Sequence, residues 1–170
     1  MKQNYNALIL KSVKITAGAI LAILFASCLN LKYSATAGII TILSIQNTKK
    51  ETIQTALARG EAFCCALLVS FLCYDFFGYT TTAFGIYLLI FTTLCLIMKW
   101  SSAIAMDSVL ITHFLAEKTM NIPMIANEIS LFLIGAGIGV LLNLSLRPKE
   151  NAWKDKMAEA DESIRAIIQR

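Results

Sequence analysis

Residues 39–51 read IITILSIQNTKKE, an apolar run with hydroxyl and amide side chains that ends abruptly in two lysines. The apolar segment around it, residues 33–46, would be about 21 Å long as a helix. That length is short of the roughly 30 Å hydrocarbon core of a bilayer. A helix this short and this polar is typical of a transporter's binding site rather than of a simple membrane anchor.

The composition of the whole chain indicates a membrane protein. Of its 170 residues, 57% are hydrophobic and only 15% are charged, and the mean hydropathy is +0.66. Soluble domains carry about 25% charged residues, so this chain lacks the charge to cover a surface in water. The basic residues lie between apolar runs rather than on one face of a soluble module, so nucleic acid is not an expected partner. The lipid bilayer is the expected environment.

Cysteines, metals and catalytic groups give no sign of a reactive centre. The five cysteines all lie inside apolar runs and form no CxxC pair, so we interpret them as small buried apolar residues. No metal site and no cofactor is expected, because no cluster of metal-binding residue types is present. The sequence also lacks a Ser/His/Asp or Cys/His arrangement and a glycine-rich phosphate loop, so we expect no enzyme.

Six apolar segments predict an all-α integral membrane protein with six transmembrane helices. Their predicted bounds are residues 15–31, 33–46, 60–79, 83–98, 101–116 and 124–146. The pair Thr48 and Glu51 has the spacing of a capping box, so the third helix should begin there and run on into its span. Residues 1–14 precede the membrane domain at 15–146. Residues 147–170 follow as an amphipathic helix with a heptad seam.

Small residues predict close helix contacts in two of the spans. Gly18 recurs with Ala22 and Ala26 at every fourth position of the first span, and Gly135 and Gly139 form a GxxxG pair in the last. Both patterns let another helix approach closely.

The distribution of basic residues predicts the orientation in the membrane. If the N-terminus is cytoplasmic, only Lys32 and Lys118 among the lysines and arginines face outward. The positive-inside rule therefore places both termini in the cytoplasm. On this topology Lys49, Lys50 and Arg59 are ordinary inside charges, or alternatively a cytoplasmic mouth that attracts an anion.

A weak internal repeat divides the membrane domain. A shift of 67 residues lays Cys28–Ala35 on Cys95–Ser102 with four identities in eight positions. Because each half then holds three spans, the two halves, about 15–81 and 82–146, would enter the membrane from opposite sides. We therefore predict a 3+3 inverted repeat, as in many transporters. Chance similarity between apolar segments is the alternative.

Polar residues within the apolar runs are the candidates for a substrate or ion pathway. They are Thr41, Gln46, Asn47, Asp107, Ser108 and His113. In the middle of the fifth span, Asp107 would bind a cation or proton, pair with a lysine, or hydrogen-bond a neighbouring helix as a neutral acid. His113 would couple transport to protons, or act as a hydrogen-bonded residue at a helix end. The repeat pairs His113 with Gln46 on opposite sides of the membrane.

Two carboxylates fall at matching positions of the repeat. Glu61 and Glu128 are each predicted at the start of the last helix of their half. There they would neutralise the positive end of that helix, or alternatively contact a substrate.

Residues 34–51 resemble the signature of the bacterial aromatic acid exporter family, which belongs to the wider fusaric-acid-resistance group. Segments 111–113 and 127–128, and the stretch from Gly135 to Pro148, resemble that family as well. The resemblance implies a six-helix domain in the bacterial plasma membrane that forms a dimer and exports organic anions such as aromatic acids.

Two functions are therefore compared below. The first is a transporter or channel subunit for a small organic, and by resemblance aromatic, acid anion. The second is a non-transporting membrane scaffold that assembles with partners through residues 147–170.

Overall fold

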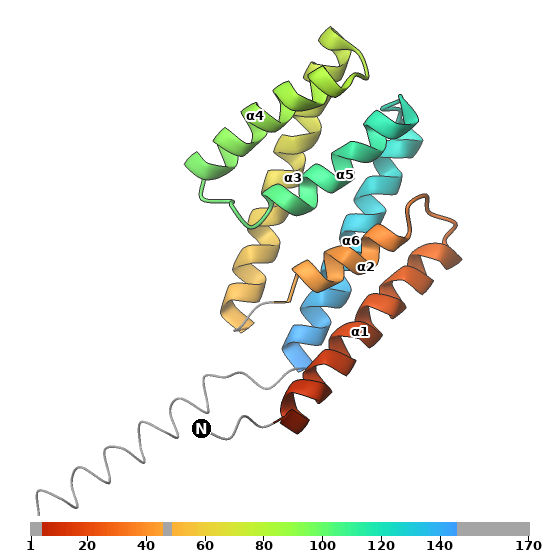
Figure 1. Cartoon of the computed structure of the whole chain (residues 1–170), viewed down its shortest axis with the longest axis vertical. Coiled ribbons are helices and arrows are strands. Elements are labelled where there is room, and N and C mark those ends of the chain that lie inside the picture. Colours follow the sequence, from red (N-terminus) through yellow and green to blue (C-terminus); the bar gives the residue numbers. More distant parts are fainter. Residues whose placement is uncertain (1–4, 46–48, 146–170) are drawn as a thin grey trace, which may run out of the picture.

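The computed structural model describes residues 5–45 and 49–145 (Figure 1). This part of the chain contains six α-helices and no strand. The helices are α1 (Tyr5–Cys28), α2 (Ala35–Leu43), α3 (Lys49–Phe77), α4 (Thr81–Ile97), α5 (Ile104–Glu117) and α6 (Ile122–Ser145). The all-α prediction is confirmed. The predictions for Gln46, Asn47, Thr48 and the C-terminal helix at 147–170 lie outside the described residues.

Only three of the described helices are long and apolar enough to cross a membrane. Their spanning segments are Lys11–Cys28 in α1, Thr52–Phe77 in α3 and Ile122–Leu144 in α6. The apolar helix α4 is shorter, and α2 and α5 have 9 and 14 residues. The helices therefore divide into three long ones, α1, α3 and α6, and three shorter ones, and a full six-span topology stays a prediction.

The turns before the two short helices share one backbone hydrogen bond. Left-handed residues occur in both turns, Asn30 and Tyr33 in the first and Lys99 in the second, but none of them matches another at an offset of 67 residues. The Tyr33 carbonyl accepts from the Thr36 amide at 2.8 Å, and the Trp100 carbonyl accepts from the Ala103 amide at 2.8 Å. Each partner in the second bond lies 67 residues after its counterpart in the first, which is the offset of the predicted repeat.

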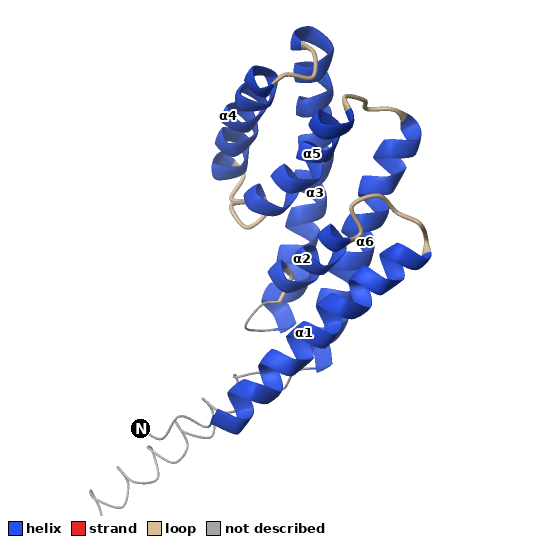
Figure 2. Cartoon of the chain, turned by 45° about the vertical axis from the view of Figure 1, so that its right-hand side comes forward, coloured by secondary structure: helices blue, strands red, loops and turns tan. Residues whose placement is uncertain are grey.

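The helices pack as two groups of three (Figures 1 and 2). Helices α1, α2 and α6 contact one another, and so do α3, α4 and α5. The last helix of each sequence half therefore packs on the first two helices of the other half. Contacts of α2 with α5, and of α3 with α6, join the groups. This exchange fits a two-fold relation between halves, although the inverted repeat stays a prediction.

The surface of the bundle is apolar. Large exposed apolar side chains lie on all four of the longer helices, among them Phe25, Leu68, Phe76, Leu89 and Leu133. Buried apolar residues form two clusters, one centred on α3, α4 and α5 and one on α1, α2, α5 and α6. A surface this apolar is suited to lipid rather than water.

Glycines on α6 allow α2 to approach its backbone. A Cβ atom added at Gly135 would lie 2.6 Å from the Ala37 carbonyl oxygen, and one at Gly139 would lie 2.5 Å from the Ser44 Cβ. Gly18 on α1 faces the Leu142 side chain of α6, whose flexible end would have to shift to admit a Cβ atom. Because real Cβ atoms do not approach this closely, α2 and α6 can lie this near each other only with glycine at both positions.

We expect the substitution Gly135→Ala to destabilise the protein by about 1–3 kcal/mol, as overpacking of a tight contact does. Gly137→Ala is the matched control, because nothing lies within 4 Å of a Cβ atom added at this neighbouring position. Thermal unfolding of both variants in detergent measures the difference. Equal melting temperatures for the two variants would contradict the α2–α6 contact.

Candidate functional site

The short helices α2 and α5 lie in contact in the centre of the bundle, each against a long helix. Thr36, near the start of α2, lies within 3.3 Å of His113, near the end of α5. The two helices therefore run in opposite directions. Buried charged side chains gather at both ends of this pair, and they form the candidate site.

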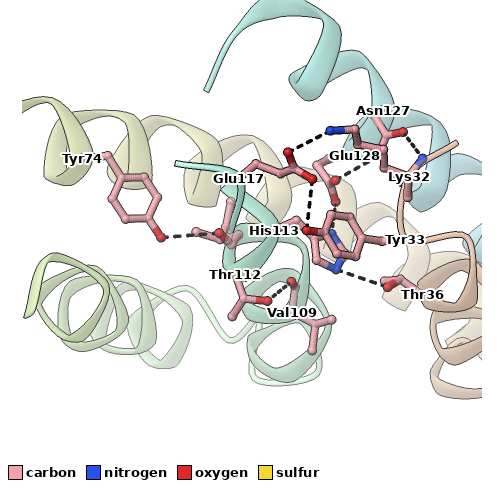
Figure 3. Close-up of polar contacts among 11 residues, drawn as sticks. Lys32, Tyr33, Thr36, Tyr74, Val109, Thr112, His113, Glu117, Asn127 and Glu128 are labelled. Carbon is pink, nitrogen blue, oxygen red and sulfur yellow. Dashed lines mark hydrogen bonds and ion pairs between the residues drawn. The ribbon is translucent and has the colours of Figure 1, made fainter. Parts of the chain in front are cut away.

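At one end lies the histidine cluster, defined as Tyr33, Thr36, His113 and Glu128 (Figure 3). His113 Nδ1 lies 2.7 Å from Glu128 Oε2, and His113 Nε2 lies 3.3 Å from Thr36 Oγ1. Both titratable side chains are buried. In the tautomer that carries hydrogen on Nδ1, the imidazole donates to Glu128 Oε2, and the Thr36 hydroxyl donates to Nε2.

Tyr33 covers this cluster from the loop between α1 and α2. Its ring stacks on the His113 ring with centroids 4.0 Å apart and an interplanar angle of 4°. The Tyr33 hydroxyl donates to Glu117 Oε1 at 3.2 Å, and Lys32 Nζ donates to Glu117 Oε2 at 2.8 Å. The hydrogen bond to Glu117 raises the pKa of Lys32, and burial followed by the bond to Glu117 raises the pKa of Tyr33.

Asn127 fixes the same loop to α6. Its Oδ1 accepts from the Lys32 amide at 2.8 Å, and its Nδ2 donates to the Lys32 carbonyl at 3.1 Å. Nδ2 also donates to Glu128 Oε1 at 3.0 Å. One amide side chain thus links the loop backbone to the buried carboxylate (Figure 3). The histidine cluster is therefore a connected and fully bonded network.

At the other end lies the arginine cluster, defined as Ser44, Arg59, Tyr87, Asp107 and Ser108. Arg59 is 4% exposed and donates from Nη1 to Ser44 Oγ at 3.3 Å, but its Nε has no partner. Asp107 is fully buried, and neither carboxylate oxygen has a partner. The Tyr87 and Ser108 hydroxyls also make no well-formed hydrogen bond, although they lie close enough to interact with each other. Asp107 interacts electrostatically with Arg59 and Tyr87 without forming a hydrogen bond to either.

Apolar side chains separate the two clusters. Ile40 of α2 and Leu110 of α5 lie between the polar residues of their helices, and both are almost fully buried. Phe63 of α3 and Phe132 of α6 belong to the same apolar group, and their rings stack with centroids 5.0 Å apart. Buried apolar side chains on α2 and α5 therefore separate the two clusters.

Two sequence predictions about helix position need correction. Asp107 lies in the first turn of α5 rather than in the middle of a span, because the turn at residues 98–103 delays the helix until Ile104. Glu61 lies twelve residues after the first residue of α3, Lys49, and it is exposed, so it cannot neutralise a helix start. Glu128 lies in the second turn of α6 and bonds His113 and Asn127.

The remaining predicted residues are dispersed. Arg59 is buried in the arginine cluster rather than exposed at a mouth, whereas Lys49 and Lys50 are the first residues of α3. The Thr41 hydroxyl lies 2.9 Å from the Ala37 carbonyl and 3.0 Å from the Gly135 carbonyl, so it serves the α2–α6 contact. Among the residues described, no group of three His, Cys, Asp or Glu side chains could hold a metal ion.

The structure adds residues that sequence reasoning did not propose for the site. They are Lys32, Tyr33, Thr36, Tyr87, Glu117 and Asn127. The predicted topology places Lys32 and Glu117 on the same side of the membrane. Their opposite charges could therefore have predicted the ion pair between them. Nothing in the sequence marked Tyr87, because a tyrosine in an apolar run is ordinary.

We expect Asn127→Ala to release the loop at residues 29–34. The Lys32 amide loses its acceptor, so its hydrogen exchange should become about tenfold faster or more, as expected for the loss of about 1.4 kcal/mol. Ser130→Ala is the control, because the Ser130 hydroxyl bonds only the Ala126 carbonyl of its own helix at 2.7 Å. Unchanged exchange at Lys32 in Asn127→Ala would contradict the fixed loop.

Comparison with known proteins agrees with the apolar, all-helical architecture. The chain matches the model of the family described as aromatic acid exporter family member 1 over residues 7–146. It is 36% identical over 163 residues to "Uncharacterized protein YqjA" of Bacillus subtilis (strain 168). That alignment covers 94% of this chain and 51% of the relative, so the chain spans about half the length of this curated relative. No solved structure matches the chain. The chain belongs to the aromatic acid exporter family.

Proposed function

We propose that the chain forms a transport pathway that exports small organic acid anions, aromatic acids foremost, across the bacterial plasma membrane. The observation that carries this proposal is the burial of Arg59, Asp107, His113 and Glu128 at the two ends of the α2–α5 pair. Charged side chains inside a membrane domain are costly and usually line a substrate or ion pathway. Membership of an exporter family supports transport rather than enzyme activity.

The arginine cluster supports an organic anion as the substrate. Arginine binds carboxylates well because its guanidinium is always charged and presents several donors. Next to it, α4 contributes stacked aromatic rings: Phe84 on Tyr87 with centroids 5.6 Å apart, and Tyr87 on Phe91 at 5.4 Å. Tyr87 and Phe91 are fully buried. A cluster that contains both a guanidinium and an aromatic side chain, Tyr87, suits a ligand that carries both a carboxylate and an aromatic ring.

The apolar centre supports a gated pathway. Apolar constrictions close a channel by excluding water, and transporters open one side of a central site at a time. The side chains of Ile40, Leu110, Phe63 and Phe132 would have to separate for a substrate to pass. Helix α3 packs on α4 and α5, and α6 packs on α1 and α2. Movement of these two helix groups relative to each other would separate the four apolar side chains.

The alternative of a non-transporting scaffold rests on residues 147–170, which lie outside the described residues. No contact in the described part of the chain favours it. A homodimer is proposed on the family resemblance.

Purified protein in liposomes should release trapped, labelled benzoate faster than protein-free liposomes. Because benzoate must cross by way of the buried cation, Arg59→Gln should slow release at least tenfold. Lys11→Gln, which removes an exposed lysine of α1, is the matched control and should behave as wild type. Wild-type liposomes that release no organic anion, with either a proton gradient or a membrane potential imposed, would contradict the proposed function.

The proposed orientation, with both termini cytoplasmic, can be tested with two exposed lysines. Lys99 and Lys118 both have left-handed backbone geometry, with φ of 62° and 50°, and lie in turns at opposite ends of α5. In a variant whose five native cysteines are replaced by alanine, we expect Lys118→Cys to react with a membrane-impermeant maleimide in intact cells. Lys99→Cys should react only after permeabilisation. The reverse pattern would invert the topology.

A further inference from the structure

The arginine cluster contains every buried side-chain atom without a hydrogen-bond partner that is found in residues 5–45 and 49–145. These five atoms are Arg59 Nε, both Asp107 carboxylate oxygens, Tyr87 Oη and Ser108 Oγ. Buried polar groups are nearly always hydrogen-bonded, and each exception needs an explanation. Their concentration between α3, α4 and α5 indicates a place where a polar group of another molecule completes the bonding.

The chemistry of the five atoms restricts that group. Arg59 Nε–H can only donate, the Tyr87 and Ser108 hydroxyls can donate or accept, and Asp107 can accept or, when protonated, donate. A metal ion is disfavoured because a buried guanidinium of the same sign shares the cluster. A carboxylate satisfies the donors, but its charge repels an ionised Asp107. The conflict disappears when Asp107 carries a proton.

We infer that the arginine cluster binds the carboxylate group of an organic anion together with one proton, which resides on Asp107. Arg59 Nε–H donates to one oxygen of the ligand, and the Asp107 O–H donates to the other. The Tyr87 and Ser108 hydroxyls hold the orientation. The proton is taken from solution as the anion binds and returns to solution when the anion leaves. This inference rests on the proposed function and names its binding site and the proton that is bound with the anion.

The charge balance explains why the proton and the anion bind together. With Arg59 charged, an ionised Asp107 and a bound carboxylate would leave one uncompensated negative charge in a buried site, which is costly. Protonation removes it and adds the donor that the ligand needs. The other titratable groups that face Asp107 are Tyr87 and Cys95 of α4, and phenols and thiols are uncharged at pH 7 and below. Arg59 is the only other charge that faces Asp107 from the packed helices described.

Calorimetric titration of the purified full chain in detergent with benzoate tests this inference. At a pH above that at which Asp107 of the free protein releases its proton, wild type should take up about one proton per benzoate bound, measured from the difference between two buffers of unlike ionisation enthalpy. Affinity should fall about tenfold per pH unit above the pH at which Asp107 releases its proton. Benzyl alcohol, which lacks the carboxylate, should not bind.

Two variants separate the roles of the pair. Asp107→Asn keeps a neutral donor, so it should bind benzoate with no proton uptake and with little dependence on pH. Arg59→Gln should weaken binding at least tenfold at every pH, whereas Lys11→Gln should not change it. If Arg59→Gln fails to fold, judged by elution on size-exclusion chromatography, Asp107→Asn alone still decides the proton count.

Each outcome bears on one proposal. Binding with unchanged proton uptake in Asp107→Asn overturns the role of Asp107, and wild-type affinity in Arg59→Gln overturns the site. If wild type does not bind benzoate, water molecules alone would satisfy the unpartnered atoms of the cluster, and the inference is overturned. If benzoate binds with proton uptake but does not cross the membrane of liposomes, the proposed function is contradicted. If benzoate crosses at the same rate in the Arg59 and Asp107 variants as in wild type, the proposed function holds but the arginine cluster is not its binding site.

Discussion

The contact between α2 and the glycine face of α6 positions everything else in the candidate site. Gly135 and Gly139 bring the α6 backbone against Ala37 and Ser44, and the Thr41 hydroxyl bonds the Gly135 carbonyl at 3.0 Å across the same contact. A nine-residue helix has little stability of its own, so α2 depends on this packing. Its position in turn brings Thr36 to His113 and Ser44 to Arg59.

The two ends of the α2–α5 pair bury charge in different ways. In the histidine cluster, every polar contact is closed: Glu128 bonds His113 and Asn127, and Tyr33 covers the imidazole ring. Such a network stabilises one conformation. In the arginine cluster, Asp107 and Arg59 interact only at a distance and leave bonding capacity unused. The first end is thus built as a closed structural element, and the second is incomplete by itself.

The rest of the bundle follows from the solvent around it. Large apolar side chains such as Leu68, Phe76 and Leu89 lie on the outside, where lipid rather than water can accommodate them. Polar side chains lie inside, between the short helices. This distribution is the reverse of that in a soluble domain, and it is the arrangement expected for a member of an exporter family. The long helices α1, α3 and α6 supply the frame that carries the short pair.

The sequence by itself determined the class of the protein. Apolar run lengths predicted six helices and the short α2, the glycine spacing marked close packing on α6, and the segment at residues 34–51 indicated the family. These features depend on local composition and periodicity, which a linear sequence displays directly. The start of α3 at Lys49 was predicted for the same reason, because capping depends on neighbouring residues.

Only the tertiary structure decided which polar residues meet. Sequence reasoning placed Glu128 and His113 on the same side without pairing them. It expected Arg59 to be an ordinary inside charge or part of a cytoplasmic mouth, and it did not include Tyr33 or Tyr87 in the site. Those pairings join residues 15 to 95 positions apart, as in His113 with Glu128 and Lys32 with Asn127. They depend on how helices from opposite halves cross, and on which face of each helix points inward. In a chain that is apolar all round, hydrophobic periodicity carries little of that information, because lipid-facing and protein-facing positions are both apolar.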